Sequence, residues 1–235
     1  MKYCNTKLGL MLNIGCGYTN TPGDWINIDN SFSAILARYP RIKKFLSRIK
    51  VIPKRLYDLP WPNNITVLDV RKGLPYKDKT VRYIYVSHFL EHLSKKDCEC
   101  FLRECYRVMM KEGIIRIIVP DLQGLSQNYI NKIKGIKKDA ANITSPADEF
   151  IERLGLFDRA GEDDSFLIRF VKVLQSNKNI HKWMYDYYSL SLKLKQTGFV
   201  RITQKEYLDS AIEKIGILDN PDRFKYSLCV EASKA

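Results

Sequence analysis

Short apolar segments, each typical of a buried strand, are spaced along the whole chain, and this spacing constrains the fold more than any other feature. They are residues 8–14, 25–29, 65–70, 81–87, 114–119, 199–203 and 226–232. Most are bounded by glycine, proline or an acidic residue, which mark the ends of strands. A chain built from such segments buries them in one sheet.

Two helical patterns separate these segments. In residues 93–111 the apolar side chains fall on one face, Ser94 is placed to cap the helix start, and Gly113 follows its end. Residues 187–197 predict a shorter helix that ends at Gly198. Strands that alternate with helices predict an α/β fold, namely a Rossmann-like, doubly wound, seven-stranded and mostly parallel sheet.

The 235 residues suit a single domain, 1–235, with two helical insertions. The first, at about 31–58, contains a basic amphipathic helix that Pro40 interrupts. The second, at about 122–180, is polar and helical and includes an acidic patch at 162–164. We predict that this second segment is an insertion or a lid.

Positive charge is concentrated in the first insertion. The formal net charge is +13, and residues 38–55 include eight basic residues and no acidic one. Such a cluster favours an anionic partner, which is a nucleic acid, an anionic membrane face or a phosphate-bearing molecule. The alternative is a set of solvated lysines without a binding role.

The N-terminal region and the cysteines indicate a cytoplasmic protein. The first apolar run ends in glycines typical of a functional turn, so we expect no signal peptide, and no run of 18 uncharged apolar residues predicts a membrane-spanning helix. The six cysteines form no CxxC pair, which favours reduced thiols and predicts no metal site.

The first strand leads directly into a Gly15-Cys16-Gly17 turn, where glycine lets the backbone adopt positive φ and approach a ligand. Asp29, at the end of the second strand, is placed to accept hydrogen bonds from both hydroxyls of a ribose. A dinucleotide site would have a third glycine, but Asn20 holds that position. The predicted ligand is therefore a nucleoside without a pyrophosphate.

At this point the chain resembles the class I S-adenosylmethionine-dependent methyltransferases, and more narrowly the type-11 group often associated with surface-glycan biosynthesis. The similar segments, in order, are LNIGCG, GDWINIDNS, LDV, VSHFLEHL, RVMMKEGIIRIIVPDL, HKWMYDYYSLSLKLKQTGF and SLCVEASK. They cover about 10–125 and 181–234. The resemblance implies that strands one to five are parallel and that the last strand is reversed.

The resemblance also implies that S-adenosylmethionine is the cofactor and which residues bind it. They are Asn13, Gly15, Cys16, Gly17, Asp29, Asp69, Val70, Ser87 and His88. The glycines would lie under the methionine portion and Asp29 would hold the ribose. Asp69 would face the adenine amino group with Val70 beside the ring, and Ser87 and His88 would border the transferable methyl.

Two features depart from the usual pattern of this class. Asn13 replaces the acid that usually opens the first motif, which weakens a link to the cofactor's amino group. Only 11 residues separate Gly17 from Asp29, too few for a strand and a full crossover helix, so we expect a turn there. Simpler interpretations also stand: the glycines could serve only a tight turn, and Asp69 could merely cap the next loop.

Three residues are candidates for catalysis: His88, His181 and Glu91. His88 follows the fourth strand, whose carboxyl end opens onto the cleft in this architecture. A histidine near neutral pKa suits the deprotonation of a hydroxyl acceptor, with His88 as the first candidate and His181 as the second. Glu91 could instead stabilise a helix end, and the aromatic residues after His181 could line an acceptor pocket or pack a lid.

The predicted function is O-methylation of a sugar in a glycan or lipid-linked saccharide, a choice that rests on the resemblance alone. One alternative is an RNA methyltransferase, favoured by the charge but without a recognisable nucleic-acid-binding module. Another is a non-catalytic cofactor-binding or scaffold protein of a glycan-assembly complex. The basic helix predicts peripheral contact with an anionic membrane, at its inner face, or with a phosphate-bearing carrier.

Overall fold

The computed structural model describes residues 9–19, 21, 23–49, 52, 57–58, 61, 64–135, 145–156 and 180–235. The structural statements below concern these residues. The predictions for Cys4, Asn20, the basic residues at 50, 54 and 55, and the acidic patch at 162–164 lie outside them.

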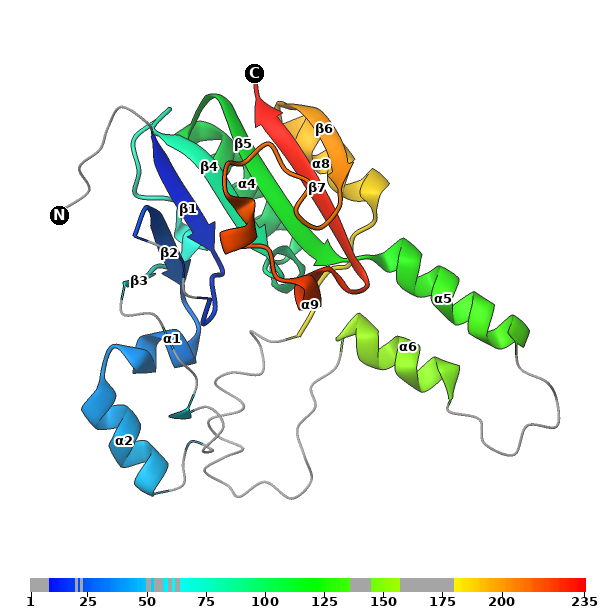
Figure 1. Ribbon diagram of the computed structural model, residues 1–235, viewed down its shortest axis with the longest axis horizontal. Coiled ribbons are helices and arrows are strands. Elements are labelled where there is room, and N and C mark those ends of the chain that lie inside the picture. The colour runs from blue at the N-terminus through cyan, green and yellow to red at the C-terminus, as the bar shows by residue number, and fades with distance from the viewer. Residues whose placement is uncertain are drawn as a thin grey trace.

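A seven-stranded sheet forms the centre of the molecule (Figure 1). Its strands are β1 (Leu10–Ile14), β2 (Trp25–Asp29), β3 (Ile65–Val67), β4 (Val81–Ser87), β5 (Met109–Pro120), β6 (Phe199–Lys205) and β7 (Ser227–Lys234). The order is β3-β2-β1-β4-β5-β7-β6, with β1 to β5 parallel and β7 antiparallel to both of its neighbours. This arrangement confirms the predicted Rossmann-like fold and the reversed last strand.

The strand order places a topological switch at β1, which pairs with β2 on one side and β4 on the other. In open α/β sheets ligands bind in a crevice beyond the carboxyl ends of the strands at such a switch, so we expect the crevice at this position. Figure 1 shows that the helices of both predicted insertions also lie beyond this edge.

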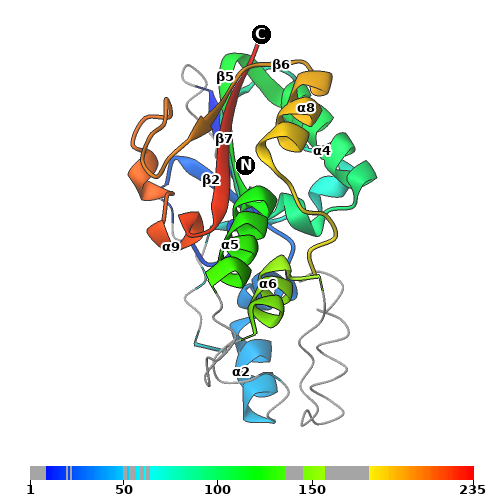
Figure 2. The same cartoon turned by 90° about the vertical axis from the view of Figure 1, so that its right-hand side faces the viewer.

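The helices lie on one face of the sheet, beyond its carboxyl edge and in the segment before β7. They are α1 (Phe32–Ala37), α2 (Pro40–Arg48), α4 (Lys95–Val108), α5 (Leu122–Gly135), α6 (Pro146–Leu154), α8 (Tyr187–Thr197) and α9 (Pro221–Phe224), with 3₁₀ turns η1 (Val70–Lys72), η2 (Leu90–His92) and η3 (Ile215–Ile217). Figure 2 shows α4 and α8 together on one side of the sheet. Phe101 and Leu102 of α4 and Leu190 and Leu194 of α8 are fully buried in that core. No helix in the described part of the chain is long and apolar enough to span a bilayer.

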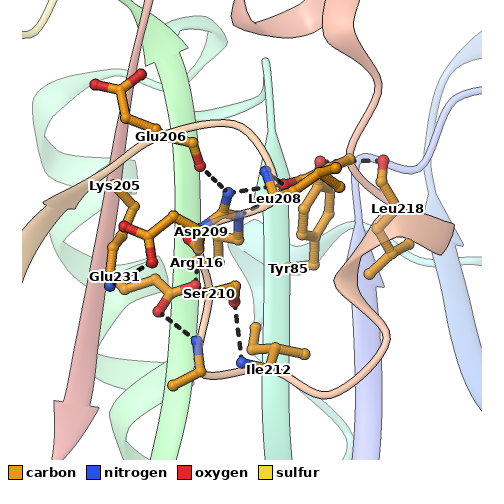
Figure 3. A network of polar contacts seen from close by, with 12 residues as sticks. Tyr85, Arg116, Lys205, Glu206, Leu208, Asp209, Ser210, Ile212, Leu218 and Glu231 are labelled. Atoms are coloured by element: carbon orange, nitrogen blue, oxygen red, sulfur yellow. Dashed lines mark hydrogen bonds and ion pairs between the residues drawn. The ribbon is translucent and has the colours of Figure 1, made fainter.

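The opposite face is covered by the segment between β6 and β7, and its anchor is a buried ion network around Arg116 (Figure 3). Arg116 of β5 is fully buried and contacts two carboxylates, at 2.7 Å from Asp219 and 2.8 Å from Glu231. It also donates to the carbonyls of Glu206 and Asp209. One side chain thus fixes to the sheet a long segment whose described helical parts, η3 and α9, are short.

The predicted helix 93–111 is wrong at its C-terminal end. Ser94 caps the start as predicted, because its side chain accepts from the Asp97 N–H. The helix ends at Val108, however, and Met109 already pairs with Val81 in the sheet. The Lys234 ammonium donates to carbonyls at this end, including that of Met109 at 2.8 Å. These groups would otherwise lack partners.

Gly113 therefore does not terminate a helix. It lies inside β5, where an added Cβ would come within 2.9 Å of the Met110 carbonyl oxygen and 3.0 Å of that of Arg82. The glycine is required because two backbone segments approach closely at an irregularity of the ladder.

In the first insertion Pro40 separates two helices, as its position predicts. Ser31 caps α1 through its side chain, and α2 begins at Pro40, where proline suits the first helical position. The apolar side chains of α2 are not packed on the sheet: Ile42 is 51% exposed and Phe45 is 59% exposed. The described part of α2 is thus a basic helix with an open apolar stripe.

Candidate active site

The glycine turn after β1 is shaped by two residues with positive φ. Gly15 has φ +68°, and a Cβ added there would lie 2.8 Å from the Cβ of Phe89. Gly17 has φ +55°, and among the described residues only the Arg223 guanidinium, at 3.6 Å, would meet its Cβ. Gly15 therefore allows the segment after β4 to pack on the turn, while Gly17 leaves the backbone open towards the crevice.

The N–H groups of this turn are used inside the protein. Those of Gly15 and Cys16 donate to the Ile28 carbonyl, at 2.8 and 3.2 Å, and that of Gly17 donates to Asp29 Oδ2 at 2.9 Å. A pyrophosphate needs free N–H groups at a helix N-terminus. The described residues from 15 to 24 form turns and no helix starts among them, as predicted. The crevice thus suits a nucleoside without a pyrophosphate.

The Asp29 carboxylate lies at the carboxyl end of β2 and faces the glycine turn. Its Oδ2 accepts from Gly17, and its Oδ1 accepts from the Ser31 N–H at 2.7 Å. A carboxylate oxygen has two lone pairs, so each oxygen keeps one acceptor site. Asp29 therefore organises the turn and still offers acceptors to a ribose, and its predicted cofactor role stays a prediction.

Asp69 begins the turn that follows β3. The Arg71 guanidinium forms two hydrogen bonds to it, at 2.7 and 2.8 Å, and lowers the pKa of the Asp69 carboxyl. Asp69 also caps η1 by accepting from the Arg71 N–H. The simpler interpretation, a loop cap, thus accounts for its position, while Val70 beside it is buried. Contact of either residue with adenine stays a prediction.

Asn13 and Cys16 are buried and have internal partners. The Asn13 amide donates to Asn27 Oδ1 at 3.0 Å, and the Thr21 hydroxyl donates to the same oxygen. Burial, with the nearby Asp29 carboxylate, raises the pKa of Cys16 to about 12, so its thiol stays protonated. Both side chains stabilise the strands under the crevice, and their predicted cofactor contacts are untested.

His88 follows the buried Ser87 at the end of β4 and has φ +52°. Its Nε2 lies 2.9 Å from the Arg223 carbonyl oxygen, and its Nδ1 lies 3.3 Å from Glu91 Oε1. Burial opposes protonation, but the Glu91 carboxylate outweighs it and the pKa of His88 is raised. Both ring nitrogens therefore face acceptors, which is the environment of an imidazolium rather than of a base.

Glu91 is fully buried and is the point where separate segments meet. Its carbonyl accepts the N–H groups of Lys182 and Trp183, at 2.6 and 3.2 Å. These bonds bring His181, distant in sequence, beside Glu91 and His92. All three histidines of the chain thus gather at one buried carboxylate, next to the segment that packs on the glycine turn.

The remaining two histidines are oriented by backbone carbonyls. His92 Nδ1 lies 3.2 Å from the Ile180 oxygen, and His181 Nδ1 lies 2.7 Å from the Leu154 oxygen. A carbonyl only accepts, so each Nδ1 carries the proton and each Nε2 keeps a lone pair. Burial lowers the pKa of His181, so its ring is neutral near pH 7. The structure thus brings together all three predicted catalytic residues.

Two residues of this region, Arg223 and His92, were not predicted from the sequence. Arg223 follows the Asn220 cap of α9, and its guanidinium donates to Thr19 Oγ1 at 3.3 Å, beside the glycine turn. In the described part of the chain no carboxylate forms an ion pair with it. Arg223 lies far along the chain from the glycine turn, so no local sequence pattern predicts that the two meet. His92, in the same motif as Glu91, could have been predicted as a site residue.

Comparison with known proteins agrees with this geometry. Residues 12–117 match the family model described as a methyltransferase domain. The matched segment contains the glycine turn, Asp29, Asp69 and the His88–His92 motif. No curated protein matches the chain.

Solved structures with similar folds include other methyltransferases. A SAM-dependent methyltransferase from Archaeoglobus fulgidus is 17% identical, with 97% of this chain and 87% of that chain covered and a TM-score of 0.46. One from Methanosarcina mazei is 14% identical, with 99% and 94% covered and a TM-score of 0.49. A structure of PigF with SAH is 12% identical, with 99% and 52% covered and a TM-score of 0.44. Similarity at this level carries no information on the substrate.

The matched methyltransferase domain identifies the reaction class and the cofactor. The protein is an S-adenosylmethionine-dependent methyltransferase, which confirms the predicted enzyme class and cofactor. The crevice fits this molecule, because it combines an open glycine turn with carboxylates, and the N–H groups of Gly15, Cys16 and Gly17 are already bonded within the protein.

Proposed function

We propose that this S-adenosylmethionine-dependent methyltransferase methylates a hydroxyl group of a sugar, in a glycan or a lipid-linked saccharide. When bound, the cofactor supplies a methyl group already activated on a sulfonium sulfur. In the reaction the O–CH₃ bond forms as the S–CH₃ bond breaks, and the hydroxyl proton passes to a base. The protein therefore has to position two molecules and remove one proton.

Cofactor binding is assigned to the groups around the glycine turn. Gly17 leaves room for the methionine portion, Asp29 offers acceptors to the ribose, and Asp69 with Val70 lies at the end of β3 for the adenine. The Arg223 guanidinium beside Gly17 suits the methionine carboxylate, because the described residues provide it with no acidic partner.

The observation that carries the proposal is the convergence of three histidines on Glu91 beyond the end of β4. A sugar hydroxyl is a weak acid, and it needs a proton acceptor more than a nitrogen or thiolate acceptor does. Since both nitrogens of His88 face acceptors, we place His88 in a positioning role. His181, neutral and with a free Nε2 lone pair, becomes the first candidate for the proton acceptor.

The sugar class is supported by the surroundings of this cluster and by the resemblance to glycan-associated enzymes. Trp183, whose N–H binds the Glu91 carbonyl, is 37% exposed, and the Lys95 ammonium lies 3.6 Å from the centre of its ring. An aromatic face beside polar groups suits a ligand that is apolar on one side and hydroxylated on the other.

Methyl transfer to defined acceptors tests the proposal. Purified protein is incubated with S-adenosylmethionine labelled in the methyl group, together with either a lipid-linked saccharide fraction or total RNA. We expect base-stable label in the saccharide, and surface polysaccharide from a deletion strain should lack one methyl group by mass spectrometry. Label in RNA alone would overturn the sugar assignment.

The RNA alternative has one structural observation in its favour. Tyr39 and Phe45 are 55% and 59% exposed on the basic helix region, beside Arg41, Lys43 and Lys44. Aromatic and basic side chains together suit single-stranded nucleic acid. Turnover distinguishes the scaffold alternative from both enzyme alternatives, because a scaffold would bind S-adenosylhomocysteine but transfer no methyl group to either acceptor.

A further inference from the structure

We propose that Glu91, His92 and His181 bind a divalent transition-metal ion. One potential ligand atom from each side chain lies within 4.8 Å of the other two. Two imidazoles and one carboxylate form a donor set that suits zinc or another imidazole-binding ion of the first transition row. This site rests on the geometry of the cluster and not on the nature of the methyl acceptor.

Both histidines are held in the form that binds a metal. Their Nδ1–H groups donate to the Ile180 and Leu154 carbonyls, at 3.2 and 2.7 Å, so the Nε2 lone pairs remain available. A metal-binding histidine almost always donates its other N–H group in this way, because the bond fixes the tautomer and the ring orientation.

Glu91 supplies the negative charge, and its carboxylate has few other partners. The residue is 0% exposed, and neither side-chain oxygen accepts a hydrogen bond within the described structure. Its charged contact is with His88 Nδ1, 3.3 Å from Oε1. An ion at Oε2 would offset the cost of burying this carboxylate, and His88 would orient it from the other side.

The fold also fixes the most distant ligand. The His181 N–H donates to the Gly155 carbonyl at 2.8 Å, just beyond the end of α6. Gly155 has φ +62°, and a Cβ there would lie 2.6 Å from His181 Nδ1. The glycine is therefore required to let the imidazole reach the last carbonyl of the helix. Helix α6, from the predicted lid, thus positions a residue of the site.

The separations are close to those of a bound site. With metal–ligand bonds of 2.0–2.2 Å, ligand atoms in a tetrahedral site are about 3.4 Å apart. From separations of up to 4.8 Å, side-chain shifts of about 1 Å would complete the coordination. Three protein ligands leave positions for solvent or an acceptor hydroxyl, whose pKa such an ion lowers. In the ion-bound form His181 would be a ligand rather than the proton acceptor proposed above, and hydroxide on the ion would accept the hydroxyl proton.

Cobalt binding tests the site without any need for turnover. Metal-free protein is titrated with Co²⁺ while its visible d–d absorption is recorded, and metal content is measured after dialysis. We expect one ion per chain and a spectrum that shows nitrogen ligands and fewer than six ligands. Glu91→Gln and His181→Gln should each weaken binding at least a hundredfold, while Glu99→Gln, the same change on the exposed face of α4, should leave it unchanged.

Two outcomes would contradict the proposal: no stoichiometric cobalt, or binding that is equal in wild-type protein and both site variants. Thermal unfolding of each variant shows whether the protein is folded, and because His181 lies in a half-buried loop its variant provides the test if Glu91→Gln unfolds. The affinity for S-adenosylhomocysteine is measured in parallel. If a variant loses cobalt but keeps its cofactor affinity, the metal site is separate from the methyltransferase assignment. If the wild-type protein binds cobalt but methylates no sugar, only the proposed acceptor is overturned.

Discussion

The Asp29 carboxylate combines structural hydrogen bonds with a predicted contact to the cofactor ribose. It holds the glycine turn through Gly17 and the start of α1 through Ser31, and it keeps one acceptor site on each oxygen. Removal of the whole side chain would disturb the turn as well as the predicted ribose contact. An isosteric substitution is therefore the informative one.

Asp29→Asn should weaken S-adenosylhomocysteine binding by about 10- to 100-fold, because a charge-assisted hydrogen bond contributes about 1.5–3 kcal/mol. Calorimetry measures the dissociation constant, and Asp24→Asn, at an exposed position before β2, is the control. An unchanged constant for Asp29→Asn would mean that the ribose is bound elsewhere.

The free energy of unfolding should depend on pH through the Glu104 carboxyl. The Arg107 guanidinium and the Leu74 N–H hold the pKa of the Glu104 carboxyl at about 2, against an ordinary value of 4.5. A lowered folded-state pKa stabilises the protein above the unfolded-state value. This stabilisation is lost as the pH falls from about 4.5 towards 2.

Glu104→Gln should lower the free energy of unfolding by about 1 kcal/mol at pH 7, because solvent screens the partly exposed pair of Glu104 and Arg107 and limits its contribution. Urea titrations from pH 7 to pH 3 measure it. The difference between wild type and variant should shrink below pH 4.5, because the Glu104 carboxylate of the unfolded wild-type chain binds a proton there while that of the folded protein stays ionised. A difference that is constant with pH would assign the effect to packing instead.

At the scale of elements, helix α2 buries none of its residues. Its apolar side chains Ile42 and Phe45 are more than half exposed, next to Lys43, Lys44 and Arg48. A helix with an apolar stripe and flanking basic residues suits the interface of an anionic membrane. We keep peripheral membrane contact as a prediction for this element.

Wild-type protein should sediment with anionic liposomes at low salt, and less so at physiological ionic strength, where exposed charges are screened within about 8 Å. Replacement of Lys43, Lys44 and Arg48 by glutamine should abolish sedimentation and leave cofactor affinity unchanged. The same replacement at the exposed Lys111, Lys195 and Lys214 controls for net charge. Wild-type protein that binds RNA but does not bind liposomes would favour the nucleic-acid alternative.

At the scale of the whole molecule, the Arg116 network joins segments that are far apart in sequence. Arg116 on β5 bonds Glu231, which lies directly across the ladder on β7 (Figure 3). It also bonds Asp219 on the covering loop. The side chain is fully buried, so its partners cannot be replaced by water. Loss of the cation would leave two buried carboxylates uncompensated.

Arg116→Met should therefore lower the free energy of unfolding by about 3–5 kcal/mol, while Arg103→Met, on the exposed face of α4, should change it by less than about 0.5 kcal/mol. Urea unfolding followed by circular dichroism measures both. Equal stability of the two variants would show that the loop is held by its apolar contacts alone.

Much of the fold and part of the site follow from the sequence by itself. The strands and the helix at 187–197 were predictable because they depend on local periodicity and on caps such as Ser94 and Gly198, which act over a few residues. The glycine turn and Asp29 were predictable for the same reason, since a short loop joins them and their spacing fixes their contact.

Only the tertiary structure decided which distant groups meet. His181 reaches Glu91 through backbone bonds from Lys182 and Trp183, and Arg223 reaches the glycine turn from the other end of the chain. Both nitrogens of His88 face acceptors, and one of these is the carbonyl of Arg223, which is remote in sequence. Such contacts depend on how elements pack in space, and no short-range pattern in a single sequence records that packing.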